Sequence, residues 1–134
     1  MIHQFFNFQN DFFLKIKILN DFKDYQKINM KNLIFYVTVP NFEEGKRLAR
    51  ILVESKAAAC VNLIKDIFSI YHWKGKIEEA NEGLLIIKTS EKKSEDLINI
   101  VNKNHSYELP ECVGVKIEDG SKKYINWINE AISN

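Results

Sequence analysis

From residue 33 onwards, apolar runs of strand length alternate with stripes of helical period, and their order constrains the fold more than any other feature. The first run is "LIFYVTV" (33–39), which indicates a buried strand closed by Pro40 and Asn41. Asn41 is a candidate N-cap, because two glutamates and then a leucine and isoleucine stripe follow it. A helix ending near Ser55 is therefore expected.

The middle of the chain indicates a long hairpin. "AACVNLI" (58–64) and "IFSIYHW" (67–73) are strand segments joined through a bend, and Gly75 marks a tight turn after them. "KIEE" and "GLLIIKT" supply the returning strand, in which we expect a bulge or another irregularity at 81–83.

The last third repeats the alternation of helix and strand. Ser90 is expected to cap a second helix, Pro110 precedes the strand "CVGVKI" (112–117), and Ser121 begins a final helix. The order is β-α-β-β-α-β plus one helix. It predicts an α+β fold of the ferredoxin-like split βαβ type, with two helices on one face of a four-stranded sheet. We expect this domain to span residues 32–134.

Residues 1–31 differ from this domain. They are rich in Phe, Asn and Lys and contain no Gly, Pro or Arg, so secretory and transit signals fit poorly. We expect an extension with a short helix. Met30 is a hypothetical natural start, because the domain begins directly after it.

Charge and cysteine content exclude several classes of protein. A formal charge of +1 gives no long-range attraction to nucleic acid, and no apolar run approaches the roughly 20 residues that span a bilayer. Cys60 and Cys112 form no C-x-x-C pair, which favours reduced thiols and a cytoplasmic location. Small and β-branched neighbours indicate a buried Cys60; a reactive thiolate would need a nearby cation, and the sequence shows none.

The stretch "NHSYELPECVG" (104–114) carries candidate metal ligands. Pro110 belongs at the start of a strand, so His105, Glu108 and Glu111 are expected around a loop that leads into it. Imidazole and carboxylates suit Zn(II), Cu(II) or Ni(II). No H-x-x-H, C-x-x-C or H-E-x-x-H spacing occurs, however, and a lone loop histidine is more often a hydrogen-bonding group. Both interpretations stay open here.

The predicted hairpin carries candidate ligand contacts. Alternation places Tyr71 and Trp73 on one face and His72 on the other. Aromatic residues with polar ends suit a subunit interface or a ligand wall, and equally cross-strand packing. Lys88 ends a strongly apolar run, so its ammonium must either stay at the sheet edge or pair with a carboxylate, from Glu82 or from another subunit.

Taken together, these stretches resemble the CutA family of divalent-cation tolerance proteins, in order and spacing, over residues 32–132. The matching motifs are "AACVN" (58–62), "SIYHWKGKIE" (69–78), "LIIKT" (85–89), "HSYELPE" (105–111) and "YINW" (124–127).

The resemblance implies a tight homotrimer with sheet edges joined between subunits. It also implies a role in metal tolerance by binding or sensing, with no catalysis, no nucleic acid and no organic cofactor. A cleft between subunits is expected to gather ligand contacts and metal contacts. On this sequence they are Tyr71, Trp73, Lys88 and Tyr107 for the ligand, and His105, Glu108 and Glu111 for a copper or zinc ion.

The chain departs from the family at the copper positions. Val39 stands where bacterial relatives have a cysteine, and Asn104 replaces the first of two adjacent histidines. Loss of a thiolate disfavours Cu(I) and leaves a borderline or hard site. Two alternatives remain: a sensor resembling the PII trimers, with Lys88 contacting an anionic metabolite, and a scaffold that docks proteins through residues 1–31.

Overall fold

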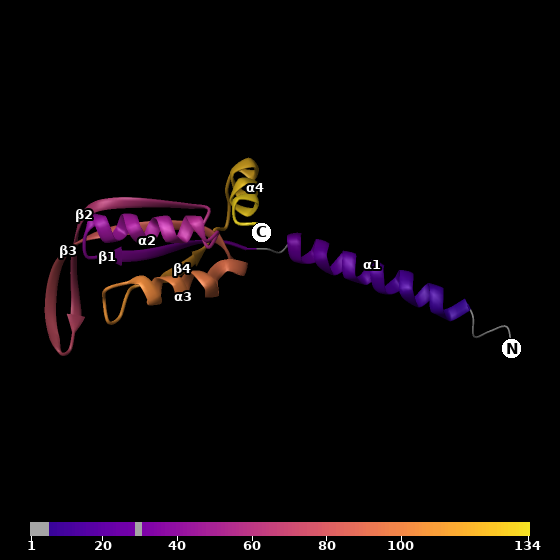
Figure 1. Cartoon of the computed structure of the whole chain (residues 1–134), viewed down its shortest axis with the longest axis horizontal. Coiled ribbons are helices and arrows are strands. Elements are labelled where there is room, and N and C mark those ends of the chain that lie inside the picture. Colours follow the sequence, from indigo (N-terminus) through magenta and orange to yellow (C-terminus); the bar gives the residue numbers. More distant parts are fainter. Residues whose placement is uncertain (1–5, 29–30) are drawn as a thin grey trace. The chain divides into compact units, whose positions relative to one another are not determined.

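The computed structural model describes residues 6–28 and 31–134, and the contacts divide the chain into two units after residue 30. The first contains helix α1 (Phe6–Ile28), which at 23 residues is longer than the short helix expected. The second, Lys31–Asn134, is an α+β domain (Figure 1). The hypothetical start at Met30 lies outside the described residues. None of the described helices has the length and apolar character needed to cross a membrane.

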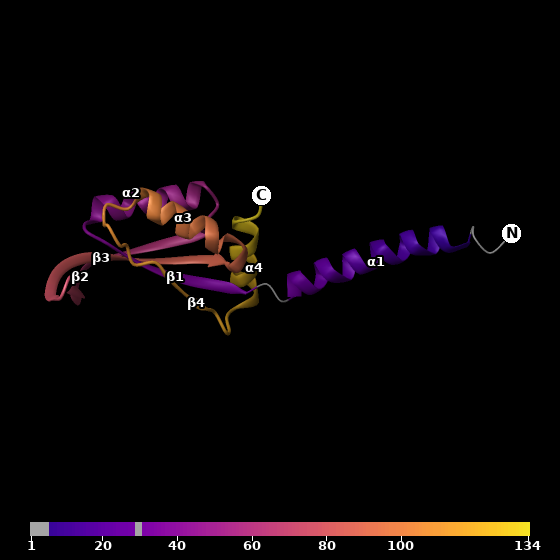
Figure 2. The same cartoon turned by 90° about the horizontal axis from the view of Figure 1, so that it is seen from below.

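The domain contains one four-stranded antiparallel sheet of order β2-β3-β1-β4. Helices α2 and α3 both cover the same face of it (Figure 2). This arrangement confirms the predicted split βαβ fold with an additional C-terminal helix. The elements are β1 (Asn32–Val39), α2 (Phe42–Glu54), β2 (Cys60–Trp73), β3 (Lys76–Ser90), the 3₁₀ turn η1 (Glu91–Lys93), α3 (Ser94–Asn104), β4 (Val113–Lys116) and α4 (Lys122–Ala131).

The core lies between the sheet and helices α2 and α3. Alternation along β1 sends every second side chain into it. Val39 is fully buried there: an added Cβ on Gly45 would lie 3.0 Å from its Cγ2, and one on Gly83 would lie 3.1 Å away. The core residues are Leu33, Phe35, Val37, Val39, Leu48, Leu52, Ala57, Ala58, Leu85, Ile87, Leu97 and Val101.

The helix starts agree only partly with prediction. Asn41 caps α2 as expected, because its side chain accepts a hydrogen bond of 2.8 Å from the backbone N–H of Glu44. Ser90 precedes η1 instead, and α3 begins at Ser94.

The bulge or irregularity predicted at 81–83 was assigned to the wrong strand of the hairpin. Strand β3 is continuous, and the irregularity lies in β2, where the register shifts between Ile64 and Ile67. Asp66 adopts a positive φ of 60° there. The extra residues on β2 bend the hairpin at the point where the sequence indicated a bend.

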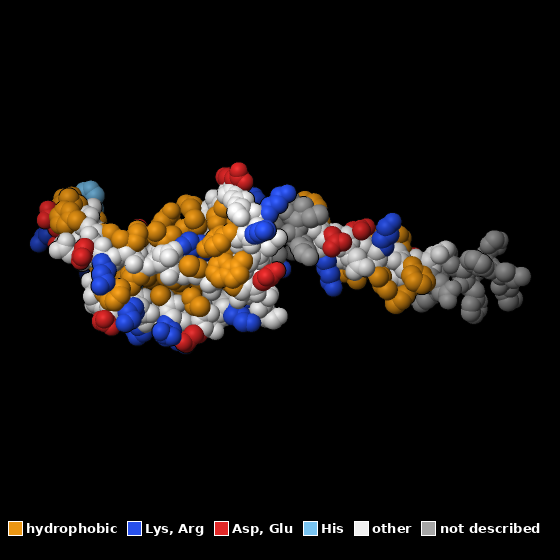
Figure 3. Space-filling model, turned by 90° about the horizontal axis from the view of Figure 1, so that it is seen from above, with side chains coloured by type: hydrophobic (Ala, Val, Ile, Leu, Met, Phe, Trp, Pro, Cys, Tyr) orange, Lys and Arg blue, Asp and Glu red, His pale blue; other side chains and the backbone are white. Residues whose placement is uncertain are grey.

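The β2–β3 hairpin extends beyond the rest of the sheet. Val39 pairs with Gly83 at the end of β1, so the part of the hairpin beyond that pair has no third strand. This overhang exposes Phe68, Ile70 and Ile77 by about three-fifths of their surface (59–61%). Hydrophobic side chains are conspicuous on the side of the domain seen in Figure 3.

Candidate functional site

A cleft of about 690 Å³ lies between the overhanging hairpin and the loop that follows α3. Strand β2 supplies one wall, which is mainly aromatic and apolar. The loop and β3 supply the other wall, which carries carboxylates. The lining residues are Thr38, Phe68, Ser69, Ile70, Tyr71, His72, Trp73, Glu82, Tyr107, Glu108, Leu109 and Glu111.

The charged groups of this cleft are glutamates; the described lining includes no lysine or arginine. Glu82 is buried, and its Oε2 accepts a hydrogen bond of 2.9 Å from the Tyr107 hydroxyl. Burial, followed by that bond and the charge of Glu82, raises the pKa of Tyr107. Burial and then the negative charge of Glu82 also raise the pKa of Glu111. The cleft therefore concentrates negative charge.

His105 faces away from the cleft, although the sequence placed it among the metal contacts. Its side chain is fully buried. Its Nδ1 accepts the backbone N–H of Tyr107 at 3.0 Å, and its Nε2 lies 2.7 Å from the carbonyl oxygen of Thr38. An accepting Nδ1 places the ring proton on Nε2, which donates to that carbonyl. Both nitrogens are thus engaged, and His105 orients Tyr107.

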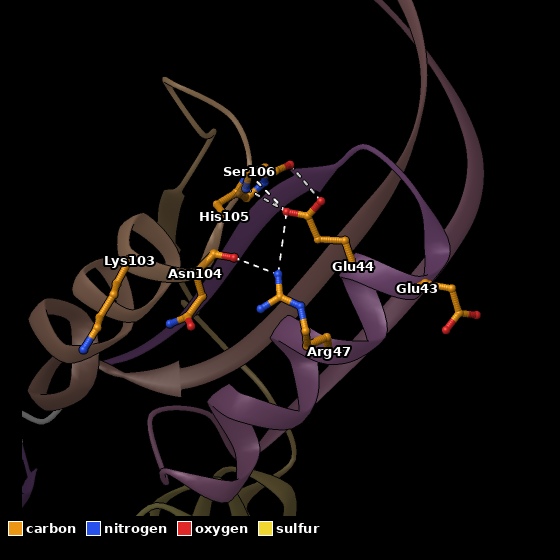
Figure 4. A pocket seen from close by; sticks show the side chains of 7 residues that line it. All are labelled: Glu43, Glu44, Arg47, Lys103, Asn104, His105 and Ser106. Atoms are coloured by element: carbon orange, nitrogen blue, oxygen red, sulfur yellow. Dashed lines mark hydrogen bonds and ion pairs between the residues drawn. The ribbon is translucent and has the colours of Figure 1, made fainter.

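A second group of contacts fixes the same loop from the outside (Figure 4). Glu44, in the first turn of α2, accepts hydrogen bonds from Ser106, at 2.7 Å from the backbone N–H and 2.8 Å from the hydroxyl. Arg47 donates to the carbonyl oxygen of Asn104 at 2.9 Å. We call this group the Glu44 clamp. It ties the loop that carries Glu108 and Glu111 to helix α2.

Sequence reasoning missed Glu44 as a loop contact and placed Glu82 only as a partner for Lys88. In the sequence, Glu44 is simply one of two acidic residues in a first helical turn, and 62 positions separate it from Ser106. Glu82 had a usable signal: it is a lone carboxylate directly before an apolar strand, so it needed a buried partner.

Five of the predicted site residues line the cleft together, and two do not. Lys88 lies opposite Cys60 in the hairpin. It is six residues along β3 from Glu82, so about 20 Å of strand separates Lys88 from Glu82. Its Nζ donates to Asn62, so the expected Glu82–Lys88 pair is absent from the described contacts. His105 is the other exception. The five are Tyr71, Trp73, Tyr107, Glu108 and Glu111.

A metal centre is not assembled within one chain. Across residues 6–28 and 31–134, the structure brings together no three histidine, cysteine or acidic side chains able to hold an ion. Glu108 is largely exposed, and its Oε2 lies 3.6 Å from Lys74 Nζ at the hairpin tip. The combination of His105, Glu108 and Glu111 therefore does not fit a metal in the single chain.

Comparison with known families identifies the domain. The sequence model described as "CutA1 divalent ion tolerance protein" matches residues 33–131. The chain belongs to the CutA1 family. Protein CutA, chloroplastic, of Arabidopsis thaliana is 46% identical over 103 residues, which are 77% of this chain and 57% of that protein. This chain thus spans just over half the length of the plant relative.

Solved structures agree with this assignment. The crystal structure of CutA1 from Oryza sativa is 44% identical, with a TM-score of 0.73 over 75% of this chain and 93% of that one. The CutA structure from Archaeoglobus fulgidus is 39% identical, with a TM-score of 0.74 over 76% and 99%. Sequence and fold thus assign the domain to the same family.

The same relatives overturn the predicted cytoplasmic location. The plant proteins are named chloroplastic, and the Archaeoglobus fulgidus structure is named a periplasmic protein. The prediction rested on the two cysteines, which are indeed free in the structure. Free thiols show that the fold needs no disulfide, which this core explains, and do not identify a compartment.

Proposed function

We propose that this CutA protein binds a divalent cation in the carboxylate-lined cleft of a homotrimer and acts as a sensor, not as an enzyme. The observation that supports this proposal is the charge of the cleft. Glu82, Glu108 and Glu111 line it, and no lysine or arginine of the described chain does. Burial and then the negative charge of Glu82 raise the pKa of Glu111, and a cation placed between the two carboxylates would offset both effects.

The chemistry of the cleft favours a hard or borderline ion. The carboxylate oxygens of the cleft suit a hard ion such as Mn(II) and also bind Zn(II). Cu(I) prefers thiolate or thioether ligands, and Val39 supplies neither. One chain offers too few ligands, so in this proposal a second subunit completes the site, as resemblance to the family implied.

Trimer formation has its own support in the exposed surfaces of the domain. Strands β2 and β4 are the sheet edges, and their unpaired backbone groups are a liability unless another chain covers them. The overhang adds Phe68, Ile70 and Ile77, and β4 adds Val113 and Val115, each about half exposed. Pairing of edges between subunits would bury this apolar surface.

The alternative of a PII-like sensor for an anionic metabolite has less support. It needs a positive charge in the cleft, and Lys88, its proposed contact, lies about 20 Å away along β3. The docking role of the N-terminal extension stays a prediction.

Calorimetric titration with Zn(II), Cu(II) and Mn(II), combined with native mass spectrometry, tests the proposal. We expect a trimer whose metal content is a multiple of three. Glu111→Gln and Glu82→Gln should each weaken binding at least tenfold, about 1.4 kcal/mol. Glu79→Gln is the control, because Glu79 lies on the hairpin but does not line the cleft.

Two results would contradict the proposal. A monomer would remove the shared site, and unchanged affinity in the Glu82→Gln, Glu111→Gln double variant would place the cation elsewhere.

A further inference from the structure

A group of polar side chains lies outside the cleft, at the other end of the hairpin. Cys60 of β2 pairs directly with Lys88 of β3, and the backbone N–H of Ala59 donates to the carbonyl oxygen of Lys88 at 2.9 Å. The Lys88 Nζ lies 3.9 Å from the Cys60 Sγ. The strand register therefore holds an amine and a thiol next to each other.

These two side chains occupy the sheet face opposite to α2 and α3. Ile87 and Thr89, on either side of Lys88, are fully buried, so alternation directs Lys88 to the other face. Asn62 accepts a hydrogen bond from the Lys88 Nζ, and the Tyr124 side chain of α4 lies near Cys60. The proposed cation site uses none of these four groups.

The other cysteine of the chain is not a partner for Cys60. Cys112 packs against the hydrophobic core, on the side of the sheet that the helices cover. Both cysteines are free. If the Cys60 sulfur is oxidised, the reactive group next to it within the chain is thus the Lys88 amine.

We propose that Cys60 and Lys88 are a modification site at which a peroxide joins the two side chains through a sulfur–nitrogen bond. In the first step the thiol is oxidised to sulfenic acid, and hydrogen peroxide is reduced to water. In the second step the Lys88 nitrogen attacks this sulfur. The S–N bond forms, the S–O bond breaks, and the sulfenic oxygen leaves as water with one proton from nitrogen, while a second proton goes to solvent.

The geometry requires little movement for this reaction. The paired strands fix both Cα atoms, and the flexible four-carbon stem of lysine can bring Nζ from 3.9 Å to bonding distance by side-chain rotation. Sulfenic acids are known to condense with thiols and with backbone nitrogen. Here a side-chain nitrogen occupies the corresponding position.

Mass spectrometry of the full-length protein after hydrogen peroxide treatment tests the site. Without reductant, the chain should be lighter by two hydrogens, trypsin should no longer cleave after Lys88, and the peptides containing Cys60 and Lys88 should remain joined. Dithiothreitol should separate them, because a thiolate attacks the linked sulfur.

Matched variants define the two partners. Lys88→Arg keeps the positive charge but offers no nucleophilic amine, since arginine stays protonated, so the linked fraction should fall at least tenfold. Lys92→Arg, at an exposed position of η1, and Cys112→Ser should leave that fraction unchanged. If a variant fails to fold, peptide mapping of the unsubstituted protein still tests whether Cys60 and Lys88 are linked.

Three results would overturn the assignment. They are sulfinic or sulfonic acid at Cys60 with Lys88 free, a disulfide between the Cys60 residues of two chains, and a link that persists in Lys88→Arg.

Discussion

Removal of the Glu44 carboxylate should detach the loop after α3 from helix α2. Both carboxylate oxygens of Glu44 accept hydrogen bonds from Ser106, at 2.7 and 2.8 Å. Glu43, the preceding residue, lies in the same first turn of α2 but accepts no described hydrogen bond from that loop. The pair Glu44→Ala and Glu43→Ala therefore separates the clamp from the favourable effect of a negative charge near a helix N-terminus.

The expected cost follows from the two hydrogen bonds. A hydrogen bond to a charged group contributes about 1.5–3 kcal/mol net, but Ser106 is exposed, and water replaces part of each bond. About 1 kcal/mol per bond is the appropriate value, so the clamp contributes about 2 kcal/mol. The Arg47–Glu44 pair, at 4.0 Å with Arg47 half exposed, adds little. The helix-dipole contribution, about 0.5 kcal/mol, is common to both variants and cancels.

Urea unfolding followed by tryptophan fluorescence measures this difference, at one fixed protein concentration because the stability of an oligomer depends on it. Glu44→Ala should lower the free energy of unfolding by about 2 kcal/mol more than Glu43→Ala, with an unchanged m-value. Ser106→Ala, which removes only the hydroxyl, should cost about half as much. If the two glutamate variants differ by less than about 0.5 kcal/mol, the clamp does not hold the loop and the reasoning fails.

Three further predictions concern the cleft and β4. Because the folded-state pKa of Glu111 is raised, ionisation of this carboxyl destabilises the fold. Glu111→Gln should therefore have a higher unfolding temperature than the parent protein at neutral pH, and this difference should vanish as the pH falls to about 4. Gly114→Ala should cost about 2 kcal/mol in thermal unfolding, since its Cβ would lie 2.8 Å from the buried Phe35 ring. Burial raises the pKa of Cys112 to about 11, so in Cys60→Ser its alkylation should be slow near about pH 8 and accelerate up to about pH 11.

Local patterns predicted most of the fold because they act over a few residues. Asn41 caps α2 as expected, since a cap needs only its own turn. The hairpin was predicted, but its irregularity was assigned to residues 81–83 of β3 instead of the segment of β2 around Asp66. Both sites interrupt an apolar alternation, and only the pairing of the strands determines which one bulges.

The site was harder to predict because its contacts join distant segments. His105 has the residue type of a metal ligand, but the carbonyl oxygen of Thr38 and the N–H of Tyr107 occupy its nitrogens. Lys88 has the charge for ligand binding, but it is on the wrong part of β3. Neither the partners of His105 nor the position of Lys88 relative to the cleft can be recognised from the neighbouring sequence. The cation that a reactive Cys60 would require is this same Lys88, 28 positions away in the sequence.

The unequal lengths of the strands give the two walls of the cleft different stiffness. The loop wall is held at Tyr107 by the buried His105 and at Ser106 by the Glu44 clamp. Tyr71 and Trp73 lie on a two-stranded ribbon, and such ribbons are marginally stable alone. Any change in the width of the cleft is therefore expected to come from movement of the β2–β3 ribbon and not of the loop wall. A ligand that contacts both walls must order the ribbon, and this entropic cost lowers its affinity. A neighbouring subunit that already holds the ribbon in place removes this cost, so the affinity rises without any contact between that subunit and the ligand.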